Sequence, residues 1–314
     1  PLGDGLRMSL ARNAIKQDDR WTSPGFLNEW VWVTPACAPD RCAVANWTGT
    51  MHIPIAHGEG RFVTKDPDLI KELEKNDQIA FRYCDEHGTT SDDPLVTPNG
   101  STAGIAGICN PAGNVIEFMP HPERTPGGDT FFLSAREWII SRKTHDSHET
   151  HNASPRGFGR IEERASKPVE LFIDTIITNN EERTVEQAAR RAEPGLTLKQ
   201  YRYIGMKDRQ ACTAALATLS VFNANKEIAY VRENGAFFRW NADTKSLEKR
   251  DTSPLKGLAL LRIDEPDTGA GAFGAGSDTG ICYDCREAGE GIVKNAALLE
   301  VFGNPHASSL FVLR

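Results

Sequence analysis

The chain has 314 residues, of which 39% are hydrophobic and 25% charged, and its formal net charge is −7. These proportions are typical of a globular protein, and the length is sufficient for two domains. The acidic balance argues against nucleic acid as the main partner, and no apolar run is long enough to span a membrane. Seven cysteines, an odd number, favour free thiols in a reducing compartment, so we expect a cytoplasmic protein.

The first part of the chain predicts a mixed α/β domain over residues 1–142. Apolar alternation and short apolar runs predict five strands, at 27–33, 51–56, 78–84, 105–108 and 114–118. The pair Asp66-Pro67 places proline in the first turn of a short helix over 66–75. A second helix, over 131–142, is expected to close the domain.

Residues 143–168 are rich in His, Asp, Glu, Ser and Gly and poor in aliphatics, which predicts a linker. Three histidines spaced by three, His145, His148 and His151, lie there, but the flanking Ser and Pro favour a solvated connector over a metal site. We therefore expect no metal and no cofactor.

A second unit of uncertain role is expected over residues 169–314. Strands at 169–177 and 200–205 alternate with helices at 185–193 and 211–222, which predicts a small α/β unit. A ferredoxin-like sandwich is one candidate for it. Residues 225–314 alternate short strands with turns.

The most informative segment ends in Pro120-His121-Pro122-Glu123-Arg124. Two prolines fix φ on either side of a histidine that lies two residues from a carboxylate. A rigid tip of this kind suits a general base and the group that orients it. The alternative is a proline-rich surface turn without chemistry.

A second segment, residues 54–62, places His57, Glu59 and Arg61 around two glycines. By itself this pattern predicts a strand that ends in a glycine-bracketed turn, and such a turn needs no chemistry. This segment precedes the first one in the chain, and the two together are more informative than either alone.

Together the two segments resemble the glutaminase (PurQ-type) subunit of phosphoribosylformylglycinamidine synthase, a class I glutamine amidotransferase of purine biosynthesis. The resemblance covers about residues 10–135 and rests on residues 54–62, 99–101, 105–108, 113–115 and 119–124. It implies that residues 1–142 are the C-terminal part of such an α/β domain, without its N-terminal third.

The resemblance implies a reaction and a set of roles. In that family a cysteine thiolate attacks the side-chain amide of glutamine, ammonia leaves, and water releases glutamate. His121 would be the base and Glu123 its orienting carboxylate, whereas His57, Glu59 and Arg61 would shape the site or its interface. The implied partner is the large formylglycinamide ribonucleotide synthetase subunit.

The chain departs from the family at the nucleophile. The family's cysteine lies in a Gly-x-Cys-x-Gly elbow upstream of both segments, and residues 1–314 contain no such motif. Cys109 follows a glycine but precedes Asn110-Pro111, which favours a turn, so we expect a small buried residue there. Two hypotheses remain: part of a glutaminase that supplies ammonia, or a non-catalytic assembly module that kept the scaffold and lost the nucleophile.

Overall fold

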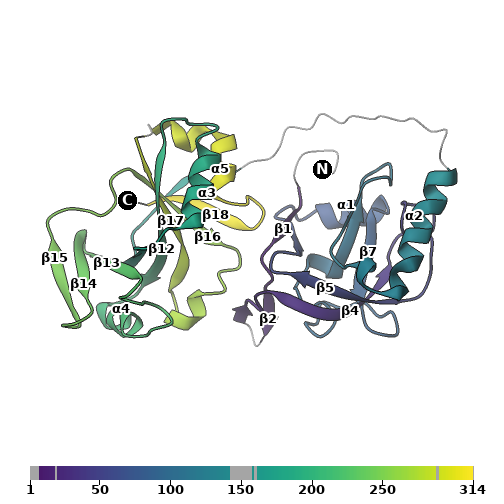
Figure 1. Cartoon of the computed structure of the whole chain (residues 1–314), viewed down its shortest axis with the longest axis horizontal. Helices are drawn as coiled ribbons and strands as arrows, with labels where there is room; N and C mark the ends of the chain where they lie inside the picture. Colours follow the sequence, from purple (N-terminus) through teal and green to yellow (C-terminus); the bar gives the residue numbers. More distant parts are fainter. Residues whose placement is uncertain (1–6, 18–19, 142–157, 159–160, 288–289, 314) are drawn as a thin grey trace. The chain divides into compact units, whose positions relative to one another are not determined.

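The computed structural model describes residues 7–17, 20–141, 158, 161–287 and 290–313 (Figure 1). Its contacts divide the chain into an N-terminal unit, residues 1–156, and a C-terminal unit, residues 157–314. Both units contain helices together with strands, which confirms the predicted mixed α/β class. Within the described ranges, no helix is long and apolar enough to cross a membrane.

An antiparallel five-stranded sheet forms the centre of the N-terminal unit, with the order β5-β4-β7-β8-β9. The strands are β4 (Leu27–Pro35), β5 (Met51–His57), β7 (Ile79–Cys84), β8 (Ile105–Cys109) and β9 (Ile116–Phe118). All five predicted strands are present. The last begins two residues later than predicted, because the Asn110 side chain accepts the N–H groups of Asn114 and Val115 in a tight turn.

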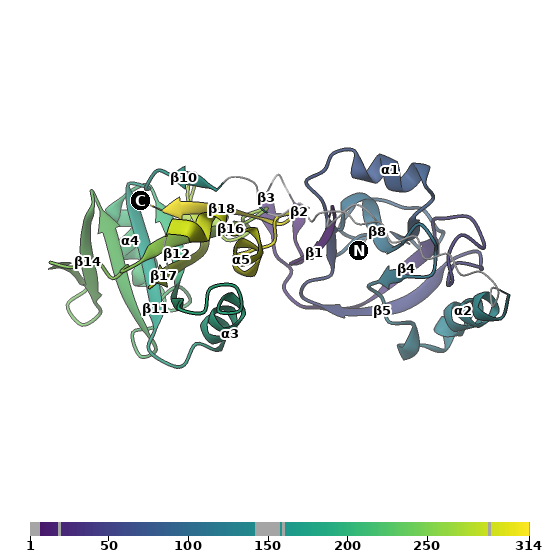
Figure 2. The ribbon, with the colours of Figure 1, turned by 90° about the horizontal axis from the view of Figure 1, so that it is seen from above.

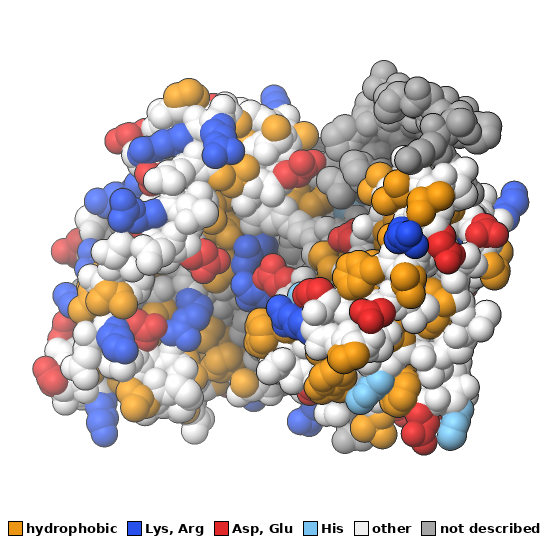
Figure 3. Space-filling model, turned by 45° about the vertical axis from the view of Figure 1, so that its right-hand side comes forward, with side chains coloured by type: hydrophobic (Ala, Val, Ile, Leu, Met, Phe, Trp, Pro, Cys, Tyr) orange, Lys and Arg blue, Asp and Glu red, His pale blue; other side chains and the backbone are white. Residues whose placement is uncertain are grey.

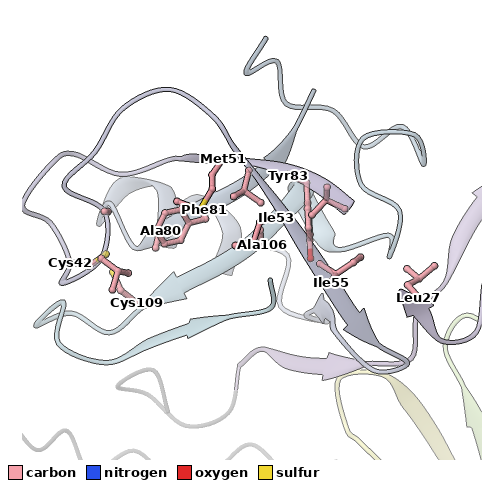
Figure 4. Close-up of a cluster of buried hydrophobic side chains, with 14 residues drawn as sticks. Leu27, Cys42, Met51, Ile53, Ile55, Ala80, Phe81, Tyr83, Ala106 and Cys109 are labelled. Atoms are coloured by element: carbon pink, nitrogen blue, oxygen red, sulfur yellow. The ribbon is translucent and has the colours of Figure 1, made fainter. Parts of the chain in front are cut away.

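One face of the sheet packs in a hydrophobic cluster (Figure 4), and on the other face Ile105 and Ile108 pack in a second cluster. Along β4, Leu27, Val31 and Val33 point into the first cluster while Trp30 between them is 54% exposed, as the alternation of a strand requires. Helix α2 (Asp129–Ser141) packs Phe131 and Ala135 against the first of these clusters. The cluster supports the chain segments that carry the candidate site.

Shorter elements complete the unit. Strand β1 (Ser9–Ala11) pairs with β6 (Arg61–Val63), and β2 (Ile15–Gln17) pairs with β3 (Arg20–Thr22). Helix α1 (Leu69–Lys75) begins three residues after the predicted start, since the Asp66 side chain first accepts the N–H of Asp68 in a turn. Hydrophobic side chains also reach the surface among charged ones, as the space-filling view shows (Figure 3).

The C-terminal unit is built on one nine-stranded sheet, with the order β10-β18-β16-β17-β12-β11-β13-β14-β15. All neighbours are antiparallel except β10 and β18, which are parallel. The strands are β10 (Glu162–Arg164), β11 (Val169–Thr175), β12 (Thr197–Met206), β13 (Glu227–Glu233), β14 (Ala236–Asn241), β15 (Ser246–Arg250), β16 (Leu258–Asp264), β17 (Asp278–Arg286) and β18 (Ser308–Leu313). This sheet is larger than the ferredoxin-like sandwich considered above, because the strands after residue 225 join the same sheet on both sides of β11 and β12.

Helices cover one face of this sheet (Figure 2). They are α3 (Asn180–Ala189), α4 (Arg209–Leu216) and α5 (Ala296–Phe302). Strand β12 directs Leu198 and Ile204 toward the helices, whereas Tyr201 and Tyr203 point into a separate aromatic cluster on the opposite face. Most of the predicted linker, together with its three histidines, lies outside the described residues, and its last part forms the edge strand β10.

Candidate functional site

The candidate site begins where the chain leaves β9 and turns toward α2. The backbone N–H of His121 donates to the carbonyl of Pro54 in β5, at 2.9 Å, so the sheet fixes the base of the tip. Pro122–Arg124 then form a single 3₁₀ turn in which Pro122 is buried. Gly128 closes against that turn, since a Cβ there would lie 2.0 Å from the Pro122 carbonyl oxygen.

Within this turn the histidine and the carboxylate meet. His121 Nδ1 and Glu123 Oε1 lie 2.8 Å apart, and the two side chains are 28% and 54% exposed. Because an ionised carboxylate only accepts hydrogen bonds, Nδ1 carries the hydrogen and Nε2 the lone pair. Desolvation opposes the ionisation of Glu123, but a backbone hydrogen bond and His121 together lower its pKa. The pair has the form of a base held by an orienting carboxylate.

His57 lies at the end of β5 in a more enclosed setting. Burial and, second, electrostatic repulsion from His121 when it is protonated lower the pKa of His57. Its Nδ1 lies 3.2 Å from Asn13 Oδ1, and among the described residues its buried Nε2 has no hydrogen-bond partner. Gly60 packs directly on the ring, because a Cβ there would lie 2.3 Å from Nδ1. The structure thus brings His57 into the electrostatic environment of His121.

Glu59 and Arg61 have different surroundings although the sequence pairs them. Glu59 is 65% exposed and receives a hydrogen bond from Arg12 Nε at 3.2 Å. Arg61 is 7% exposed, donates from Nε to the Arg12 carbonyl at 2.9 Å, and has a pKa lowered by burial. Arg61 therefore acts inside the fold, and only Glu59 is presented to solvent.

Three buried polar residues that sequence reasoning did not single out connect the segments. Asn99 donates to the Gly60 carbonyl at 2.9 Å, and the Ser101 hydroxyl accepts the N–H of Phe62 at 3.1 Å. Asn13 donates to the carbonyl of His57 at 2.8 Å. Asn99 and Ser101 lie in a stretch that carries the resemblance, which is a signal for them, whereas nothing in the sequence marks Asn13.

Cys109 is a small buried residue, as the sequence predicts. It is 1% exposed, packs in the hydrophobic cluster, and ends a strand instead of forming a strand-to-helix elbow. Among the residues that the structure describes, no group of histidines, cysteines or carboxylates has the arrangement of a metal site.

A known protein family matches the part of the chain that contains the candidate site. Residues 20–146 match the model of the CobB/CobQ-like glutamine amidotransferase domain. The match contains both candidate segments and the whole five-stranded sheet, and it ends before the C-terminal unit.

Relatives of known name match less than half of the chain. The PurQ subunit of phosphoribosylformylglycinamidine synthase from Methanothrix thermoacetophila is 40% identical over 146 residues, which are 46% of this chain and 52% of that protein. The PurQ subunit from Thermomicrobium roseum is 44% identical over 109 residues, 33% of this chain and 45% of that protein. The chain thus spans about half the length of these curated relatives.

A solved structure described as PurLQS from Thermotoga maritima is 28% identical, with a TM-score of 0.29, and the match covers 43% of this chain and 54% of that one. The sequence matches confirm the resemblance predicted from the two segments. The chain is therefore similar to PurQ-type glutamine amidotransferase subunits, and the family match includes His121 and Glu123.

Proposed function

We propose that the N-terminal unit forms the general-base part of a glutaminase site that supplies ammonia to phosphoribosylformylglycinamidine synthase. The observation that carries this proposal is the 2.8 Å hydrogen bond between His121 and Glu123, within a region similar to PurQ subunits. The enclosing turn holds the imidazole with Nε2 as its basic nitrogen. Glutamine is the proposed substrate.

The chemistry requires a thiol close to His121 Nε2. That nitrogen takes the thiol proton, the thiolate attacks the amide carbon of glutamine, and the imidazolium returns the proton to the departing ammonia. Water then cleaves the thioester with the same base, and glutamate is released. Since residues 1–314 contain no Gly-x-Cys-x-Gly motif, we infer that the thiol belongs to a polypeptide segment outside these residues.

Reconstitution tests this division of the site. The chain alone is expected to release no glutamate from glutamine. Addition of the half of the Methanothrix PurQ subunit that this chain does not match should restore release. His121→Ala should then abolish turnover, and Glu123→Gln should lower it less, by analogy with triads in which losing the carboxylate costs about two orders of magnitude less than losing the base.

A matched control separates the base from general effects of histidine loss. His52 is exposed on β5, stacks on Trp32 with ring centroids 4.5 Å apart, and is not part of the His121–Glu123 hydrogen bond. His52→Ala should therefore leave turnover near the wild-type rate. Undiminished turnover in His121→Ala would overturn the assignment, and so would glutamate release by the chain alone that Cys109→Ala abolishes.

The partner proposal follows from the fate of ammonia, which is protonated and lost if it is released into water. We propose that the unit docks on the large formylglycinamide ribonucleotide synthetase subunit through the turn that presents Glu59. Glu59→Lys should weaken co-purification with that subunit without changing the circular dichroism spectrum. Glu29→Lys, at an exposed position of β4, is the matched charge reversal and should leave binding unchanged. Equal binding by both variants would refute the docking role of Glu59.

One observation favours the second hypothesis, a non-catalytic assembly module: the absence of the cysteine elbow from residues 1–314. Such a module would bind the synthetase subunit and release no glutamate in the reconstituted mixture. Binding together with glutamate release that depends on His121 would exclude it.

A further inference from the structure

Helix α2 presents an apolar face on the outside of the N-terminal unit. Four large hydrophobic side chains of this helix are between 46% and 62% exposed: Phe132, Leu133, Ile139 and Ile140. Figures 1 and 2 both place α2 on the outside of the unit. A surface helix normally turns polar residues to this side, so an apolar face there indicates a contact with another molecule.

The opposite side of α2 already packs on the unit. Phe131 and Ala135 contact the hydrophobic cluster of the sheet. The Ser134 hydroxyl donates to the Ala43 carbonyl at 3.2 Å and accepts the N–H of Asn46 at 2.9 Å. The exposed apolar residues are therefore not needed for the packing of the helix on its own unit.

Two residues of opposite charge lie on the same line of the helix as this apolar face. Asp129 and Arg136 are seven positions apart, which is nearly two turns, so both side chains point in almost the same direction, roughly 10 Å apart along the axis. Phe132 and Leu133 lie between them. Both charged side chains are exposed, and among the described residues neither has a hydrogen bond or an ion pair. The face thus runs from an acidic residue, through apolar ones, to a basic residue.

A face of this kind is complementary to itself. If a second copy of the helix lies antiparallel on the first, with a two-fold axis between positions 132 and 133, each Asp129 meets the Arg136 of the other copy. Phe132 and Leu133 then contact their counterparts at the axis. Ile139 and Ile140 extend over the turn Pro126–Gly128, which precedes the helix of the other copy.

We propose that the exposed face of α2 is a self-association surface, through which two copies of this chain form an antiparallel, two-fold symmetric helix pair. The charges select this direction, because a parallel pair would place like charges side by side. A contact made by one helix is small beside the roughly 1,600 Å² of a standard interface, so we expect a dimer that dissociates on dilution. The proposal does not depend on the glutaminase chemistry, because His121 and Glu123 take no part in it.

Sedimentation velocity of the full chain over a series of concentrations tests the dimer. The wild type should pass from monomer to dimer as the concentration rises. Leu133→Asp places two carboxylates at the axis and should weaken the dimer at least about tenfold. Leu95→Asp, at a 94% exposed leucine of the same unit, is the matched control and should leave the dimer unchanged. A wild type that stays monomeric at every concentration would overturn the proposal, and so would equal dimerisation of the Leu133→Asp variant.

Reversal of the two charges tests the direction of the pair. Asp129→Arg places two arginines opposite each other, and Arg136→Asp places two carboxylates there, so each change should weaken the dimer. The double variant restores opposite charges and should recover most of the wild-type affinity, with circular dichroism as the check that α2 stays folded. A double variant that associates no better than the single variants would contradict the antiparallel pairing.

Cysteine cross-linking tests the position of the axis. In Leu133→Cys the two introduced thiols lie beside the axis, so oxidation should link two chains, as seen on a non-reducing gel. In Ile140→Cys they lie roughly 20 Å apart along the helices and should give no more linkage than the wild type. The reverse result would overturn this alignment. If Leu133→Asp instead weakens binding to the synthetase subunit and leaves sedimentation unchanged, the face belongs to that partner and the proposal is wrong.

Discussion

The two units bury polar groups of different kinds. In the N-terminal unit the fully buried polar side chains around the candidate site include the neutral amides Asn13 and Asn99, and both bind backbone groups of loops. In the C-terminal unit the fully buried polar side chains include the carboxylates Glu170 and Asp284. Glu170 joins neighbouring strands: Arg232 Nε of β13 donates to it at 2.5 Å and the Tyr203 hydroxyl of β12 at 2.8 Å.

The difference shows two ways in which a buried polar group specifies structure. A neutral amide has donors and an acceptor in fixed positions, so it can hold several loops in one arrangement with a modest desolvation cost. A buried carboxylate is costly without its partner, so it selects the pairing that places a cation beside it. We infer that the amides position the site in the N-terminal unit, whereas Glu170 fixes strand register in the C-terminal unit.

The largest effect is expected when a buried ion pair is broken. Arg232→Met leaves the Glu170 carboxylate buried without its cation, which should lower the free energy of unfolding of the C-terminal unit by about 3–5 kcal/mol. Hydrogen exchange of the β11 and β13 amides measures this locally. The double variant Glu170→Gln with Arg232→Met should recover most of the loss, because it removes the charge while Gln still accepts the Tyr203 hydroxyl.

An exposed pair on the same strand provides the control. Arg209 contacts Glu233 of β13, and the Arg209 side chain is 51% exposed. Arg209→Ala should change the stability by only about 0–1 kcal/mol. If Arg232→Met costs no more than Arg209→Ala, the buried pair does not stabilise the sheet as inferred.

An intermediate effect is expected at the amide that organises the candidate site. The Asn13 side chain donates to the carbonyls of Gly25 and His57, at 2.9 and 2.8 Å, and accepts the N–H of Gly60. Asn13→Ala leaves these buried groups unsatisfied and should cost the N-terminal unit about 1–3 kcal/mol, measured by urea unfolding. Asn13→Asp keeps the acceptor but loses both donors, so it should also destabilise. Asn28→Ala, at an exposed position of β4, should be neutral.

The same contrast explains what the sequence could reveal. Strand β4 follows from the alternation of Leu27, Val31 and Val33 with exposed residues, whereas β7 and β8 are short apolar runs that are buried on both faces. The pairing of His121 with Glu123 was predictable because the partners are two residues apart and prolines restrict the turn. The structure contains the hydrogen bond between His121 and Glu123, whereas their catalytic role stays a prediction.

Contacts between distant segments were not predictable in this way. Asn13 meets His57 across 44 positions, and neither residue carries a local pattern that indicates the other. Arg61 lies beside exposed Glu59 in the sequence, yet pairing of β6 with β1 buries it. The nine-stranded sheet depends on pairings such as β16 with β18, and the alternation in residues 225–314 predicts strands without specifying their neighbours.

The smallest expected effect is a pH dependence that distinguishes the half-buried His57 from the exposed His52. Burial and repulsion from protonated His121 lower the pKa of His57 in the folded state, whereas in the unfolded state it is about 6.5. Below about pH 6.5 the unfolded chain therefore binds a proton that the folded unit does not. The contribution of neutral His57 to the free energy of unfolding is complete above that pH. It is lost as the pH falls toward the folded-state pKa of His57, by at most about 1.4 kcal/mol for each pH unit.

Substitution of His57 should remove this acid sensitivity. His57→Gln has no titrating ring, so the decrease in melting temperature between about pH 7.5 and 5.5 should be smaller than in the wild type. His52→Gln, at an exposed position of the same strand, should keep the wild-type slope. At still lower pH the carboxylates become protonated. The lowered pKa of Glu123 affects the stability only in that more acidic range, below about pH 4.3. Identical slopes in His57→Gln and the wild type would show that His57 is protonated equally in both states. Asn13 and Gly60 would then hold the His57 ring in place without keeping it neutral.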